Sequence, residues 1–227
     1  MKSAPLRILF SYGLAGPACN PVALLLVLFT VFLAMPALGE APRRIVAIGD
    51  SLTAGYGLEQ GDGMVPQLQR WLDVTGKGPV ELINMGVSGD TTAGGRARLD
   101  WALADGADAV ILALGGNDLL RGIEPAESRR NLDAMLSALT QRGLPVLLIG
   151  IEAPRNYGLD YKESFDAIYP ELAGKYGAIL DPRIFEGLVG EPALFQDDGL
   201  HPNAAGVAVM VERIGPQVLD LITRVGQ

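Results

Sequence analysis

The sequence predicts an α/β fold in which helices cover both faces of a parallel β-sheet. From Arg43 onward, short apolar runs rich in Val, Ile and Leu recur, and Gly, Asp or Asn closes each run. Such continuous apolar runs are typical of strands that are buried on both faces of a sheet. Amphipathic stretches separate the runs, and this alternation of strands with helices gives a doubly wound sandwich. No linker or repeat divides residues 40–227, which are expected to form one domain.

The pattern gives an order of strands and helices. Strands are expected at Arg44–Ile48, Val80–Asn84, Ala109–Leu114, Val146–Ile149 and Ala178–Leu180. Helices are expected at Val65–Leu72, Ala97–Leu103, Pro125–Arg142, Phe165–Tyr176 and Ala205–Val225. The helix over 125–142 has the clearest limits, because it has Pro near its start and Gly directly after its end.

The N-terminal segment has the pattern of a secretory signal. Lys2 and Arg7 are the only charged residues in 1–39, and the predominantly apolar segment Val22–Ala34 follows them. Small residues then precede Glu40 as they do at a cleavage site. The sequence therefore predicts a signal peptide and export to the periplasm or the exterior. A retained membrane anchor is the alternative, because the uncharged stretch is long enough to span a bilayer.

Composition excludes several classes of function. The chain carries a formal charge of −8 and a sequence pI of about 4.7, so it is not expected to bind nucleic acid. Cys19 is the only cysteine and His201 the only histidine. An intrachain disulfide is therefore impossible, and no Cys/His cluster of the kind that binds zinc is present in the sequence. We expect no metal.

Polar, glycine-rich segments follow the first three predicted strands. They are Gly49–Leu52, Gly86–Asp90 and Gly115–Asp118. A fourth segment, Asp197–Pro202, directly precedes the last helix. Because ligands of open parallel sheets bind beyond the carboxyl ends of the strands, these segments are expected to form one site.

The residue types in these segments suit acyl transfer. Ser51 would be the nucleophile, and a serine needs a base within hydrogen-bonding reach. His201 is the only imidazole available, and Asp198, three residues earlier, can fix its tautomer. The oxyanion of the intermediate needs fixed donors. The candidates are the Ser51 backbone N–H, the Gly89 backbone N–H and the Asn117 amide.

Several alternatives remain open from the residues alone. Ser88 is a rival nucleophile, although it does not lie in the Gly-x-Ser-x-Gly motif of α/β-hydrolases. Asp50 and Asp118 are rival carboxylates, and we expect both to be structural, with Asp50 supporting the turn. Gly86 competes with Gly89 as the glycine of the oxyanion site.

The order of these motifs resembles that of the SGNH or GDSL hydrolases. The similar passages are IVAIGDSLTAGYG, INMGVSGDTTAGGRARLDW, LALGGNDLLRG, EAPRNYG, FDAIYPELAGKYG and FQDDGLHPNAAG, which span nearly the whole chain after residue 40. They look most like the branch of bacterial periplasmic thioesterases, lysophospholipases and arylesterases. The resemblance implies a flavodoxin-like, three-layer α/β/α sandwich around a five-strand parallel sheet, and no cofactor.

The resemblance also implies a role for each matching residue. Ser51 is then the nucleophile, and Asp198 and His201 are its acid–base pair. Gly89 and Asn117, with the Ser51 N–H, form the oxyanion hole. The choice of Gly89 over Gly86 depends mainly on this resemblance.

The loop Glu152–Gly158 lines the acyl pocket in the family, so Ala153, Pro154 and Tyr157 are expected to line it here. Ala153 stands where some relatives carry Leu. The preference for long acyl chains is therefore open.

The sequence predicts a serine ester hydrolase that works through an acyl-enzyme. Its substrates would be small acyl esters, thioesters or lysolipids, without nucleic acid and without an obligate protein partner. Two alternatives use the same fold. One is a carbohydrate acetyl-esterase, which a small polar pocket would favour, and the other is a catalytically silent binding module.

Overall fold

A parallel sheet organises the computed structural model, which describes residues 41–75 and 78–226. In these ranges the strand order is β2-β1-β3-β4-β5, and every neighbouring pair is parallel. The strands are β1 (Arg43–Gly49), β2 (Val80–Gly86), β3 (Ala109–Ala113), β4 (Val146–Ile149) and β5 (Ile179–Asp181).

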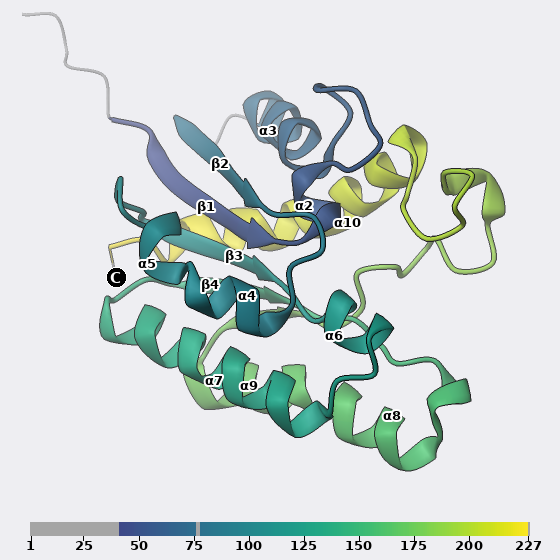
Figure 1. The fold of residues 1–227 in the computed structure, drawn as a ribbon. Helices are drawn as coiled ribbons and strands as arrows, with labels where there is room; N and C mark the ends of the chain where they lie inside the picture. The colour runs from purple at the N-terminus through teal and green to yellow at the C-terminus, as the bar shows by residue number, and fades with distance from the viewer. Residues whose placement is uncertain (1–40, 76–77, 227) are drawn as a thin grey trace, which may run out of the picture. The chain divides into compact units, whose positions relative to one another are not determined.

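Helices cover both faces of this sheet (Figure 1). One layer holds α3 (Met64–Thr75) and α10 (Ala204–Thr223). The other holds α4 (Thr92–Ala97), α5 (Leu99–Ala102), α7 (Pro125–Gln141) and α9 (Ile168–Tyr176), with α8 (Leu159–Asp166) directly before α9. The three-layer α/β/α sandwich that the sequence predicted is thereby confirmed.

Alternation along the strands fills two separate cores. In β1, Ile45 and Ala47 pack toward α3 and α10, whereas Val46 and Ile48 pack toward α7 and α9. All four are at most 1% exposed. Successive side chains of a strand point to opposite faces, so a strand covered on both faces is apolar at every position.

Short helices lie at the carboxyl ends of the strands. α2 (Ser51–Ala54) follows β1, and α6 (Gly116–Leu120) follows β3. Two 3-10 turns, η1 (Arg155–Tyr157) and η2 (Pro192–Leu194), lie in the later loops. Because β1 pairs with both β2 and β3, the segments that follow these three strands meet where the sheet reverses its direction of winding.

The predicted elements agree with the structure for the strands and the long helices, and differ for the short ones. The strand at 146–149 has the expected bounds, and the others shift by at most two residues at an end. The single helices expected at Ala97–Leu103 and Phe165–Tyr176 were wrong. The first is α5 preceded by a separate α4, because Arg98 leaves helical geometry between them. The second is α9 preceded by α8.

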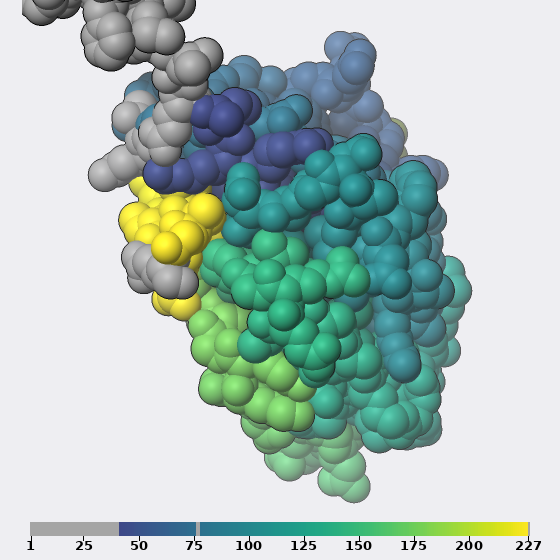
Figure 2. Space-filling view, turned by 90° about the vertical axis from the view of Figure 1, so that its left-hand side faces the viewer, coloured from purple at the N-terminus to yellow at the C-terminus, as the bar shows by residue number. Residues whose placement is uncertain are grey.

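The described chain begins and ends on the side of the sheet away from these short helices. Figure 2 shows the face at the amino ends of the strands, with the start of β1 in purple and the end of α10 in yellow. Within residues 41–75 and 78–226, no helix has both the length and the apolar character that crossing a membrane requires. The predicted signal segment, residues 1–39, lies outside the described residues.

Candidate active site

Ser51 lies at the start of a sharp turn from strand to helix. β1 ends at Gly49, and the carboxylate of Asp50 accepts a hydrogen bond from the Leu52 N–H at 3.1 Å, which caps α2. Ser51 is the first residue of this helix, so its N–H has no partner within the helix. The turn therefore presents both the hydroxyl and a free backbone donor of Ser51 at the carboxyl edge of the sheet.

A tight turn before α10 brings Asp198 and His201 together, as the sequence predicted. One oxygen of Asp198 accepts from the backbone N–H groups of Leu200 and His201, both at 2.9 Å. The other oxygen lies 2.6 Å from Nδ1 of His201. The backbone N–H of His201, then its side chain and the Leu200 N–H, lower the pKa of Asp198 to about 2. Asp198 is therefore a carboxylate at neutral pH.

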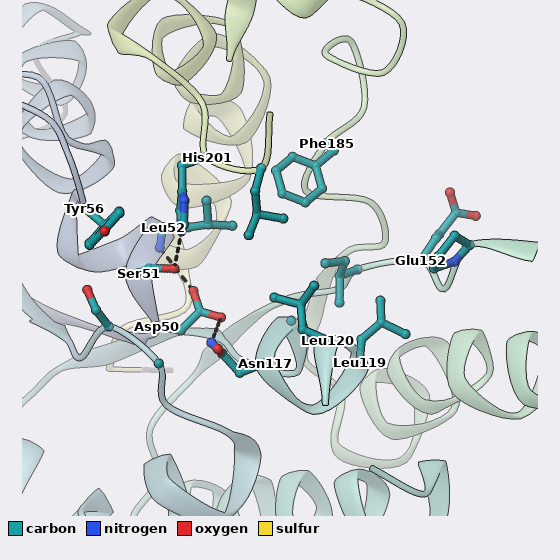
Figure 3. A pocket seen from close by; sticks show the side chains of 16 residues that line it. Asp50, Ser51, Leu52, Tyr56, Asn117, Leu119, Leu120, Glu152, Phe185 and His201 are labelled. Atoms are coloured by element: carbon teal, nitrogen blue, oxygen red, sulfur yellow. Dashed lines mark hydrogen bonds between the residues drawn. The ribbon is translucent and has the colours of Figure 1, made fainter. Parts of the chain in front are cut away.

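The imidazole connects this carboxylate to Ser51. Nε2 of His201 lies 2.9 Å from the Ser51 hydroxyl oxygen (Figure 3). Because an ionised Asp198 can only accept, Nδ1 must carry the imidazole proton, and neutral Nε2 is then the acceptor. The Ser51 hydroxyl donates to it. This arrangement permits proton transfer from the serine to the imidazole.

Tyr56 and Gln196 hold the histidine turn against the serine turn. The ring of Tyr56 lies 4.8 Å from the ring of His201, centroid to centroid. The Gln196 side-chain amide donates to the carbonyls of Tyr56, at 2.9 Å, and Pro202, at 3.0 Å. Two segments about 140 residues apart are thus joined directly beside the imidazole.

Asn117 lies on α6, next to Ser51 and Asp50. Its amide donates one hydrogen bond to Asp50 at 3.2 Å, and its second N–H is left for another acceptor. Burial raises the pKa of Asp50 above its ordinary value, against the opposing effect of the Leu52 N–H and the Asn117 amide. Asp50 supports the turn, as expected, and in addition orients Asn117.

The structure distinguishes the two candidate glycines. Gly89 lines the cavity and has φ +85°, a conformation that side chains rarely adopt. A Cβ at Gly86 would lie 2.3 Å from the backbone nitrogen of Ala54, so this glycine allows β2 to pack closely on α2. Gly89 is therefore the one whose backbone faces the space beside Ser51.

A cavity of about 470 Å³ is lined by Ser51, Gly89, Asn117 and His201. Figure 3 shows apolar side chains extending away from the serine on one side. The apolar lining consists of Leu52, Leu119, Leu120, Ile151, Pro154, Phe185 and Leu200. An apolar cavity that contains a few convergent polar groups suits a ligand with an apolar body and one polar centre.

Only one of the three residues expected from the loop Glu152–Gly158 lines this cavity. Pro154 does, whereas Ala153 is 1% exposed and belongs to the core. Tyr157 stacks on Tyr161 instead, with ring centroids 5.1 Å apart, and donates its hydroxyl to the carbonyl of Leu119 at 2.8 Å. The expectation for Ala153 and Tyr157 is corrected accordingly, because Ala153 packs in the core and Tyr157 packs against Tyr161 of α8.

A second cavity of about 350 Å³ adjoins the first. Phe185 and Glu152 border both cavities. The backbone of Ile184 donates to the Gly150 carbonyl at 2.9 Å, so the segments that follow β4 and β5 hold Phe185 and Glu152 in place. These two residues therefore line both cavities.

Neither the rival nucleophile Ser88 nor the rival carboxylate Asp118 forms a hydrogen bond with the His201 imidazole. Ser88 lines the cavity, but Nε2 of His201 bonds to Ser51. Asp118 is 1% exposed, and it accepts hydrogen bonds from Thr92 of α4 and Ser128 of α7. Among the described residues there is no group of three or more His, Cys, Asp or Glu side chains arranged to hold a metal ion.

Sequence reasoning missed the apolar wall of the cavity and the ring of Tyr56. Leu119 and Leu120 directly follow the polar pair Asn117-Asp118, and Phe185 follows the last strand. Their place after the carboxyl ends of strands was the only signal that could have found them.

The chain is similar to known ester hydrolases. Residues 47–209 match the GDSL-like Lipase/Acylhydrolase family. The chain is 38% identical over 183 residues to the esterase TesA of Pseudomonas aeruginosa, covering 80% of this chain and 90% of that protein. It is 34% identical over 197 residues to the thioesterase 1/protease 1/lysophospholipase L1 of Escherichia coli K12, covering 86% and 91%.

The fold is also similar to that of a solved esterase. The crystal structure of AlinE4, an SGNH-hydrolase family esterase, matches with a TM-score of 0.68 and 45% identity, over 79% of this chain and 96% of that one. The family match covers more than half of the chain, and it confirms the family that the motifs predicted. The chain therefore belongs to the GDSL-like lipase/acylhydrolase family and is a hydrolase that acts on esters.

Proposed function

We propose that Ser51 is the nucleophile of this ester hydrolase, with His201 as base and Asp198 as its orienting carboxylate. The observation that supports this most is the unbroken series of contacts at the cavity. It runs from the Ser51 hydroxyl to Nε2 of His201 at 2.9 Å, and from Nδ1 to Asp198 at 2.6 Å. A nucleophile, a base and an orienting group within hydrogen-bonding distance are what acyl transfer requires.

The reaction then has two acyl-transfer steps. His201 takes the proton of Ser51 as the serine oxygen attacks the acyl carbonyl. The N–H groups of Ser51 and Gly89 and the free N–H of Asn117 stabilise the resulting oxyanion. The alcohol or thiol leaves with the proton from His201. Water then attacks the acyl-enzyme with His201 again as base, and releases the acid and Ser51.

For the substrate, we propose an ester or thioester with an apolar acyl or aryl group, including lysolipids. The apolar lining of the cavity supports this, and so does the range of names among the relatives, from esterase to thioesterase and lysophospholipase. A carbohydrate acetyl-esterase would be favoured by a small polar pocket, and this cavity has predominantly apolar walls. A silent binding module would have no need of the complete series of contacts.

The site of action is proposed from the N-terminal sequence. The charge pattern and apolar segment of residues 1–39 favour export to the periplasm or the exterior. Cell fractionation, together with N-terminal sequencing of the exported protein, would test this. A start at Glu40 supports cleavage, and an intact N-terminus in the membrane fraction overturns it.

The roles of the residues can be tested by hydrolysis of p-nitrophenyl esters from acetyl to palmitoyl. Ser51→Ala and His201→Ala should each lower kcat by roughly 10⁴–10⁶ while leaving the fold intact. Ser88→Ala is the discriminating variant, because Ser88 lines the same cavity. Loss of turnover in Ser88→Ala together with normal turnover in Ser51→Ala would overturn the assignment.

A further inference from the structure

Helix α6 carries more than the Asn117 amide. Two other polar side chains from this part of the chain reach the segment that follows β2, which carries Gly89. They are Asp118, within the helix, and Arg121, the residue that ends it. In Figure 1 this segment runs from β2 to α4 beside α6. The contacts therefore join the two elements that bear the Gly89 and Asn117 donors.

The first contact is buried. One oxygen of Asp118 accepts from the backbone N–H of Thr92 at 2.7 Å, and the other accepts from the Thr92 hydroxyl at 2.5 Å. The Ser128 hydroxyl donates to the same carboxylate at 2.9 Å. Asp118, Thr92 and Ser128 are at most 1% exposed. This contact fixes the start of α4 relative to α6, away from water.

The second contact is exposed and acts on Gly89 directly. Nη2 of Arg121 donates to the Gly89 carbonyl at 2.7 Å. The next N–H in the chain, that of Asp90, donates to the Val87 carbonyl at 3.0 Å. The peptide group between Gly89 and Asp90 is thus held by its oxygen and by its nitrogen, directly after the peptide group that carries the Gly89 N–H.

A glycine in this position needs such support. Gly89 has φ +85° and lacks a side chain that could restrict its backbone, so its own conformational freedom is large. An oxyanion donor acts only if it is already oriented when the charge develops. Arg121 does not line the cavity, and its guanidinium is bonded to the Gly89 carbonyl. Arg121 therefore contacts the backbone that forms the site and does not face a ligand in the cavity.

We propose that Arg121 is a positioning residue, which together with the buried Asp118 contact holds the Gly89 N–H in register with the Asn117 amide. This inference rests on the proposed roles of Gly89 and Asn117. It predicts that Arg121 affects the formation of the transition state and leaves ground-state binding of the ester unaffected.

The experiment compares Arg121→Met and Arg121→Lys with the matched control Arg130→Met, a change at an exposed arginine on α7. Kinetics are measured with p-nitrophenyl butyrate and p-nitrophenyl decanoate, and Tm is measured for each variant. Arg121→Met should lower kcat about 10- to 100-fold with both esters, since a misplaced donor loses much of its effect. KM should stay within about twofold, as for loss of a transition-state contact.

Three further results are expected. The rate of inactivation by an alkyl phosphonate, whose adduct places an oxygen at the oxyanion position, should fall in parallel with kcat. Arg121→Lys should recover part of the lost kcat, because a lysine can still donate to the Gly89 carbonyl. The Tm of Arg121→Met should match that of Arg130→Met, because both side chains are exposed.

Normal kcat in Arg121→Met would overturn the inference. A raised KM with unchanged kcat would also overturn it, since Arg121 would then bind substrate. A fall in kcat that accompanies a fall in Tm below the control would assign Arg121 to the fold instead. Failure of the proposed function is seen separately, as turnover by the unaltered protein that does not depend on Ser51.

Discussion

The buried contact behind the site makes a quantitative prediction for Thr92→Val. Thr92 is 0% exposed, and its hydroxyl donates to Asp118 at 2.5 Å and accepts from Asn131 at 3.2 Å. Valine fills nearly the same space and keeps the backbone bond from residue 92 to Asp118. Only the contacts of the hydroxyl are lost.

The magnitude follows from these contacts. The lost hydrogen bond from the Thr92 hydroxyl to the Asp118 carboxylate is worth about 1.5–3 kcal/mol, because it is a bond to a charged group. The lost hydrogen bond from the Asn131 amide to the Thr92 hydroxyl adds about 0.5–1 kcal/mol. Thr92→Val should therefore lower the free energy of unfolding by about 2–4 kcal/mol. For a chain of this size each kcal/mol corresponds to about 2–4 °C, so Tm should fall by about 4–16 °C.

Urea denaturation and differential scanning calorimetry of the purified protein would measure this change. The matched control is Thr140→Val, the same substitution at an exposed position of α7. That control should stay within about 0.5 kcal/mol of the unaltered protein. If Thr92→Val proved as stable as the control, the contacts of the Thr92 hydroxyl with Asp118 and Asn131 would contribute nothing to stability, and the magnitude derived from them would be wrong.

Three further predictions concern activity. Asn117→Ala should lower kcat by about 10²–10³ as measured with p-nitrophenyl esters, and full activity would exclude Asn117 as an oxyanion donor. Because the pKa of Asp198 is lowered to about 2, this carboxylate stays ionised as pH falls toward about 3. Protonation of Asp198 should therefore not contribute to the loss of kcat/KM with falling pH above about pH 3, and an NMR titration of its carboxyl carbon with a midpoint above that pH would contradict this. Phe185→Ala should join the cavities of about 470 and 350 Å³ and shift the preferred p-nitrophenyl ester to longer acyl chains, by about fourfold in kcat/KM for each methylene newly buried. Val189→Ala, which borders only the second cavity, should keep the original preference, and an unchanged preference in both variants would show that Phe185 is not the limit.

The sequence was sufficient for the sheet and for the meeting of Ser51 with His201. Strands buried on both faces are apolar throughout, which makes them easy to recognise, and parallel strands bring their carboxyl ends to one edge. His201 had no competitor as base, because it is the only imidazole in the chain. Asp198 could be predicted as its partner, because it lies three residues before His201 and a single turn can bring the two side chains together.

The short helices and the apolar wall could not be predicted in the same way. α2 and α6 have four and five residues, too few for a helical period to be visible. The directions of Ala153 and Tyr157 depend on a 3-10 turn and on stacking against Tyr161, neither of which residue type reveals. Phe185 comes to line both cavities only because the loops that follow β4 and β5 pack on each other.

The choice between Gly86 and Gly89 needed the backbone. The two glycines lie three residues apart in the same segment, and composition treats them alike. Gly89 has a positive φ, whereas at Gly86 the backbone of Ala54 leaves no room for a Cβ, so the two glycines have different surroundings. Similarly, Asp50 was expected to support its own turn, but its second contact, with Asn117, depends on the neighbouring strand.

Trapping the nucleophile tests the role of Ser51 most directly. The protein is treated with an alkyl p-nitrophenyl phosphonate, digested, and mapped by mass spectrometry. One adduct is expected, on Ser51, and it should be absent in Ser51→Ala and form much more slowly in His201→Ala. An adduct on Ser88, which lines the same cavity, or inactivation without any adduct on Ser51, would contradict it.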